Sequence, residues 1–198
     1  AGSKQSLTFK ATTPNSDLNY FKINYDSRFY WPLSTNHKWA FSAKAGFGYG
    51  NGYGTTNGYD QILPVQEFFR ISEMDLRGFE RNTILPRAIV VSPNWLPGTP
   101  NPDGTQGPIG SDPEFDTVIP QGRVGGNVKA VAGLEMIVPT PFLDDENSSS
   151  VRTSLFVDAA NVWDTEFDID RYSNLTPDQR ALLEDYSDPS RFRASAGL

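Results

Sequence analysis

Hydrophobic and polar residues alternate along four stretches of the chain and, more weakly, along a fifth. The four clear stretches are residues 18–31, 37–50, 126–138 and 151–163, and the weaker one is 4–13. In 37–50, for example, Phe41 and Phe47 lie on one side and Lys44 lies on the other. A period of two puts each set on one face of a β-strand, whereas an amphipathic helix needs apolar residues three and four positions apart. The pattern therefore predicts about five strands.

The length and the end residues of these strands favour a membrane protein. Runs of about eleven to fourteen residues exceed the usual strand of five or six, and a strand needs only about 9 to 11 residues to cross a bilayer. Aromatic residues stand at several strand ends, as in the girdles of membrane barrels: Tyr20, Trp31, Trp39, Tyr49 and Trp163. The pattern leaves a soluble β-sandwich with one wet face as the alternative. We expect residues 1–198 to form an all-β fold, a partial antiparallel transmembrane β-barrel with a long inserted extracellular loop.

The connections between the strands differ greatly in length. Residues 13–17 and 32–36 are short connections, 139–150 is moderate, and 51–125 and 164–192 are long. Outer-membrane barrels have short periplasmic turns and longer extracellular loops. We therefore expect 32–36 and 139–150 on the periplasmic side and the other three connections outside. The tract 175–188 predicts a short helix within the second long loop, beginning after Thr176-Pro177.

The longer loop, residues 51–125, has an apolar middle between two flexible arms. It opens on a glycine-rich run, and residues 96–126 are rich in Pro, Gly and Asp. Between these arms, residues 66–90 carry patterned apolar side chains such as Phe69, Ile71 and Leu85. A connection of this length is functional or disordered in most proteins. We expect it to fold back and dock on the barrel.

Composition excludes several classes of function. The chain has no cysteine, a net charge of −7 and one histidine, His37. Disulfides and thiolate metal sites are thus impossible, nucleic-acid binding is disfavoured, and most metal or acid–base schemes lack their histidines. No apolar run is long enough for a transmembrane helix, and no nucleophile motif is present. We expect no enzyme activity, no metal and no cofactor, and we expect the chain to be a piece of a longer protein.

Two acidic residues fall on the polar face of neighbouring predicted strands. These are Glu135 and Asp158. Arg77 stands in the middle of the long loop, and its planar guanidinium can bridge two carboxylates. Gly78 allows a tight turn beside it, and Phe79 offers an apolar anchor. Alternation permits a clasp between loop and wall through these residues, but taken alone it favours charges that are solvated independently.

An ordered series of motifs resembles the BamA family, the barrel subunits of the bacterial machinery that assembles outer-membrane proteins. Leu76-Arg77-Gly78-Phe79, followed by Asn82-Thr83-Ile84, resembles the loop motif of that family. The runs 125–135, 139–142 and 150–154, then Val162-Trp163-Asp164 and 185–189, resemble its following segments in order. The likeness covers nearly the whole chain. It departs from the family at Leu76, where Val is usual, and at the lead-in 69–74, which lacks the usual Gly pair.

The resemblance implies a function and a role for the loop motif. In the family the motif arginine packs inside the barrel against acidic wall residues, which here are Glu135 and Asp158. The implied function is the folding and insertion of β-barrel proteins into the bacterial outer membrane. The implied partners are unfolded outer-membrane β-barrel clients, the lipoprotein subunits of the assembly complex and the lipid bilayer. Two alternatives stay open: an outer-membrane transporter that secretes a polypeptide, and a plain outer-membrane channel or receptor.

Overall fold

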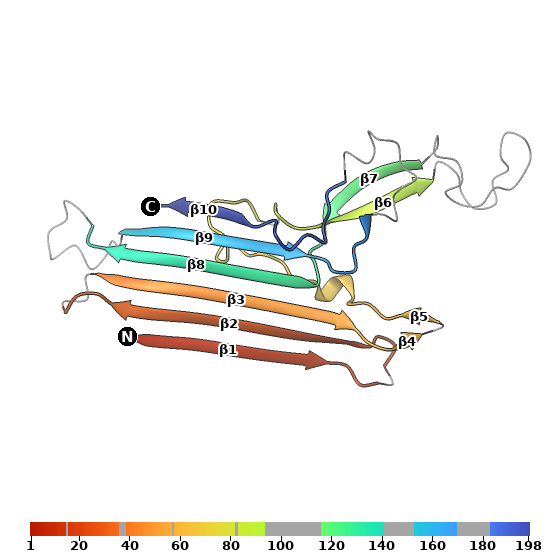
Figure 1. The fold of residues 1–198 in the computed structure, drawn as a ribbon, viewed down its shortest axis with the longest axis horizontal. Coiled ribbons are helices and arrows are strands. Elements are labelled where there is room, and N and C mark those ends of the chain that lie inside the picture. The colour runs from red at the N-terminus through yellow and green to blue at the C-terminus, as the bar shows by residue number, and fades with distance from the viewer. Residues whose placement is uncertain are drawn as a thin grey trace, which may run out of the picture.

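A six-stranded antiparallel sheet dominates the computed structural model, which describes residues 1–14, 16–35, 39–56, 58–81, 83–93, 116–140, 153–169 and 183–198. The strands lie in the order β1-β2-β3-β8-β9-β10 (Figure 1). Their bounds are β1 Gly2–Ala11, β2 Tyr20–Pro32, β3 Ala40–Gly52, β8 Val128–Val138, β9 Thr153–Trp163 and β10 Arg193–Gly197. The all-β prediction is confirmed, and the first five of these strands lie within a few residues of the predicted ones. We did not predict β10, because its short run of small residues has no hydrophobic alternation.

The segment between β3 and β8 contains short elements of its own. They are β4 Thr55–Thr56, β5 Tyr59–Asp60, the 3₁₀-helix η1 Val65–Glu67, β6 Arg87–Pro93 and β7 Asp116–Arg123. Strands β6 and β7 pair as a hairpin that stands beyond one end of the main sheet (Figure 1), and the sequence pattern did not predict it. No described helix is long and apolar enough to cross a membrane.

The short helix expected over 175–188 is not present in the described residues of that tract, 183–188. Residues 183–188 are turn and coil. Residues 175–182 lie outside the described residues, as do His37 and Asn82. Pro189 and the aspartate and serine side chains before it favour turns over a helix, because such side chains bond to nearby backbone groups. Here Ser187 donates its backbone N–H to Asp185 at 2.9 Å.

One face of the main sheet, called the outer face below, is apolar and exposed. Leu7, Phe9, Leu134 and Val157 lie on it and are 71%, 65%, 52% and 54% exposed. Strand pairing places Leu134 directly beside Val157. An apolar face of this kind suits contact with lipid chains.

Aromatic clusters stand at both ends of the outer face. At one end Phe29 stacks on Trp31 with ring centroids 5.7 Å apart, and Trp31 lies 5.8 Å from Phe41. At the other end Phe21 and Tyr49 meet edge to face at 5.8 Å. Aromatic rings at both borders of an apolar band are typical of membrane barrels, where they lie at the two lipid–water interfaces.

The opposite face, called the inner face, is covered by the loop that follows η1. A buried cluster joins loop residues to residues of β8 and β9: Ile71, Leu76, Leu85, Val131, Ala160 and Val162. The loop backbone also pairs with the wall, because Phe69 N donates to Gly126 O at 2.8 Å and Gly126 N donates to Phe69 O at 3.2 Å. The loop is therefore docked on the sheet over part of its length.

Glycines on β3 make room for this docking. A Cβ atom at Gly48 would lie 2.4 Å from the Phe69 ring, and one at Gly50 would lie 3.1 Å from Leu63. At Gly52 it would lie 1.9 Å from the backbone oxygen of Gln61. The glycine run, which the sequence indicated only as a strand leading into a flexible loop, thus forms a groove that receives the loop.

Candidate functional site

The residue that links loop to wall, Arg77, follows a tight turn at Ser72–Asp75. Ser72 donates its backbone N–H and its hydroxyl to Asp75 Oδ2 at 3.1 and 2.9 Å. In return, the Asp75 backbone N–H donates to Ser72 Oγ at 3.2 Å. This reciprocal turn orders the backbone directly before Arg77.

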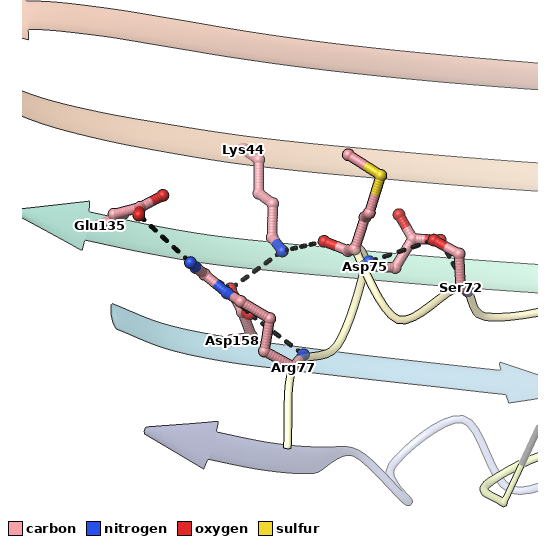
Figure 2. Close-up of polar contacts among 7 residues, drawn as sticks. Lys44, Ser72, Asp75, Arg77, Glu135 and Asp158 are labelled. Atoms are coloured by element: carbon pink, nitrogen blue, oxygen red, sulfur yellow. Dashed lines mark hydrogen bonds and ion pairs between the residues drawn. The ribbon is translucent and has the colours of Figure 1, made fainter. Parts of the chain in front are cut away.

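Arg77 binds Asp158, on the inner face of the sheet, through a bidentate contact. Its Nε donates to Asp158 Oδ2 at 2.7 Å and its Nη2 donates to Asp158 Oδ1 at 3.1 Å (Figure 2). Its Nη1 lies 3.2 Å from Glu135 Oε1. The structure therefore brings together Arg77, Glu135 and Asp158, the residues proposed for the clasp, and Figure 2 shows them converging from the loop, β8 and β9.

A second cation contacts Asp158 from the other side. Lys44 of β3 places its Nζ 3.0 Å from Asp158 Oδ1 and donates to the backbone oxygen of Met74 at 2.6 Å. The Asp158 side chain is 0% exposed. Burying a lone carboxylate is costly, so two cations and the Arg77 backbone N–H, 3.3 Å away, are what stabilise it there.

Charges within the clasp balance. Arg77 and Lys44 supply two positive charges and Asp158 and Glu135 supply two negative ones. The hydrogen bond to Asp158 is the main cause that raises the pKa of Arg77 above its usual value. Glu135 is the more exposed acid, with its side chain 30% exposed, and it borders a cavity of about 200 Å³. Solvent screens its ion pair more than that of Asp158.

Gly133 allows Lys44 and Asp158 to meet. The register places Lys44 beside Gly133 and Gly133 beside Asp158, in one row across β3, β8 and β9. A Cβ atom at Gly133 would lie 2.3 Å from Lys44 Cε and 2.4 Å from Asp158 Oδ1. Glycine is therefore needed so that the lysine can reach across β8.

The remaining motif residues hold the guanidinium in place. Leu76 is 1% exposed in the inner cluster, and Phe79 packs against the same cluster. Gly78 has a φ of 81°, in the left-handed region that disfavours side chains. The Arg77 guanidinium also lies over the Phe156 ring, with its carbon 3.8 Å from the ring centroid, a cation–π contact.

Two contributors to this site, Lys44 and Phe156, were missed by the sequence reasoning. Alternation places Lys44 on the polar face of its strand but assigns it no partner. Alternation would also have put Phe156 on the inner face, two residues from Asp158. What was missing was the strand register, which decides that Lys44, Gly133 and Asp158 share one row.

The interactions at this site are ion pairs and hydrogen bonds that position the loop. The site joins a loop to a wall, and its acidic groups are occupied by cations. Across the described residues there is no group of three or more His, Cys, Asp and Glu side chains arranged to hold a metal ion. The arrangement is suited to fixing the loop on the sheet.

Comparison with known proteins places this geometry in a family. The model of the Omp85 superfamily domain matches residues 1–198. The chain is 26% identical over 163 residues to the outer membrane protein assembly factor BamA of Neisseria meningitidis serogroup B. That alignment covers 82% of this chain and 16% of the relative, so the chain spans a small part of that protein's length.

A solved structure agrees with the sequence match. The crystal structure of BamA from Haemophilus ducreyi lacking POTRA domains 1-3 superposes with a TM-score of 0.72 and 34% sequence identity. The match covers 100% of this chain and 31% of that one. The resemblance to BamA barrels, inferred from the motifs, is thereby confirmed.

Proposed function

The chain belongs to the Omp85 superfamily, and on that premise we propose that it is part of a barrel that folds and inserts other β-barrel proteins into the bacterial outer membrane. Its sheet is part of an outer-membrane β-barrel. The observation that carries the proposal is the bidentate contact of Arg77 with the fully buried Asp158. In this role the loop is a fixed part of the working barrel and performs no chemistry on a substrate.

The proposed substrates are unfolded β-barrel clients of the outer membrane. Client strands can join an open barrel edge through main-chain hydrogen bonds, which require no cofactor. The proposed partners are the lipoprotein subunits of an assembly complex and the surrounding bilayer. This proposal is supported by the name of the Neisseria relative, an outer membrane protein assembly factor.

Charge reversal of the clasp arginine tests the proposal. In the full-length protein, Arg77→Glu puts a third carboxylate beside Asp158 and Glu135, so we expect the loop to leave the wall. Cells depleted of the unaltered protein and supplied with Arg77→Glu should lose folded outer-membrane barrels, measured by their heat-modifiable mobility on gels. Glu73→Gln, an exposed change in the same loop, is the control. Normal client assembly with Arg77→Glu, at equal protein level, would sink the proposal.

A further inference from the structure

A second polar anchor holds the loop at Glu67, close to the end of the sheet where the loop begins. We propose that Glu67 and Arg77 act together, so that the loop is a brace across the inner face from β1 to β9. This inference rests on the proposed function, since it concerns how the docked loop holds the working barrel. Glu67 would be a positioning residue that acts through the wall strands.

Glu67 is bound by residues of the first two strands. Its carboxylate forms an ion pair with Lys10 Nζ of β1, and its Oε2 lies 3.7 Å from Lys22 Nζ of β2. Tyr20 donates its hydroxyl to Oε1 at 3.2 Å. Lys22 Nζ also donates to the backbone oxygen of Glu67 at 2.6 Å. The hydrogen bond from Lys10 is the main cause that lowers the pKa of Glu67.

The residue that follows this anchor closely, Phe69, continues the attachment. Lys22 Nζ lies 4.3 Å from the centroid of the Phe69 ring. The same ring fills the space above Gly48 of β3, and the Phe69 backbone pairs with Gly126. Within three residues the loop therefore contacts β1, β2, β3 and the lead-in to β8.

The two anchors contact different strands, and they lie at different positions along the strand direction. Glu67 holds β1 and β2, whereas Arg77 holds β8 and β9. Lys10 pairs with Lys22 in the register, and the row that contains Lys44 and Asp158 crosses β2 at Arg28. Six residues along a strand separate these rows, which corresponds to about 20 Å.

A loop attached at one end only would leave the wall free to bend. Attachment at both ends ties β1 and β2 to β8 and β9 independently of the strand-to-strand hydrogen bonds between them. The apolar cluster around Leu76 and the glycine groove on β3 keep the intervening segment against the wall. The consequence is a wall of fixed curvature on this side of the barrel.

Double-mutant cycles in the full-length protein test the brace. Changes this far apart normally add in their effect on stability. If the loop is a brace, Glu67→Gln should lower the unfolding temperature of the folded barrel clearly when Arg77 is intact, and much less when Arg77 is already Ala. Additive effects of the two changes, or a Glu67→Gln protein as stable as the Glu73→Gln control, would overturn the brace.

A charge swap checks that the ion pairs, and not the shape of Glu67, carry the effect. Glu67→Lys brings three ammonium groups together and should lower stability and client insertion. Adding Lys10→Glu restores one carboxylate between two lysines and should recover both. Failure of this rescue would contradict the ionic anchor. The same variants separate the two proposals. The proposed function fails if Arg77→Glu has no effect on client insertion. If Arg77→Glu abolishes client insertion and Glu67→Lys leaves it unchanged, only the brace is rejected.

Discussion

Asp158 carries a full charge at a position with no exposed side-chain surface. Such a charge is tolerated only when partners and hydrogen bonds replace water, and removing one partner of a buried pair costs about 3–5 kcal/mol. Arg77 and Lys44 provide those partners from opposite sides. Because Arg77 belongs to the loop, the negative charge of Asp158 is paired with Arg77 only when the loop is docked. An undocked loop would leave Asp158 with Lys44 alone.

The substitution Gly133→Ala should destabilise the site around Asp158. The added methyl group would collide with Lys44 and Asp158, so one of them must move and their ion pair must lengthen. Overpacking of this kind costs about 1–3 kcal/mol, to which the weakened pair adds. We expect a lower unfolding temperature of the purified full-length barrel. Gly2→Ala, which meets nothing within 4 Å, is the matched control in a strand, and equal temperatures for the two variants would contradict the explanation.

Strand β3 is the element that joins the sheet to the loop. Its outer face carries large apolar side chains such as Phe41 and Phe47, whereas its inner face carries glycine at 46, 48, 50 and 52. Glycine is unfavourable in an ordinary strand because it loses more backbone freedom. Here the absence of side chains lets Leu63 and Phe69 lie directly on the backbone. The glycines lower the intrinsic β-propensity of the strand, but they leave a surface that fits the loop.

The substitution Gly48→Ala tests whether this groove holds the loop. Its new methyl group would overlap the Phe69 ring, so the ring must shift away from β3 and we expect the loop to lift with it, again at about 1–3 kcal/mol. We expect the loop to become accessible to protease in the folded full-length barrel while the strands persist. A second change, Phe69→Leu, should partly restore protection because a smaller side chain makes room. Unchanged protease resistance in Gly48→Ala alone would show that the groove does not hold the loop.

The main sheet has two edges, β1 and β10, and each of these strands is paired on one side only among the described strands. Within lipid an unpaired strand edge leaves backbone N–H and C=O groups without partners, and closed barrels avoid this cost. The exposed outer face adds apolar surface whose contact with water is unfavourable. This part of the barrel therefore depends on neighbouring strands to become stable in a bilayer.

Expression of residues 1–198 alone tests that dependence. Refolded in detergent or lipid vesicles, the chain should give no heat-modifiable band and should aggregate or form oligomers by edge pairing. The full-length protein, refolded in parallel, serves as the positive control. A monomeric, heat-modifiable and protease-resistant product from the isolated chain would disprove the prediction.

The local sequence pattern was sufficient to predict five of the strands and their two faces. Alternation with a period of two is a property of each strand alone, so it placed Leu134 and Val157 outward and Glu135 and Asp158 inward without knowledge of the neighbours. The loop motif and its resemblance to BamA barrels then supplied Arg77 as a partner for the two acids. The same dependence on alternation left β10 unpredicted, because that strand has no alternating apolar residues and is defined by its pairing with β9.

Which residues meet across strands depends on the packing of the strands and the loop. The row of Lys44, Gly133 and Asp158 depends on the register between β3 and β8, which are separated by a long insertion, and no local signal encodes that register. The same holds for Glu67, which reaches Lys10 from 57 positions away in the chain. The face of the sheet on which a side chain lies is set by the alternation within its own strand. The residue that it contacts is set by how the strands and the loop pack together.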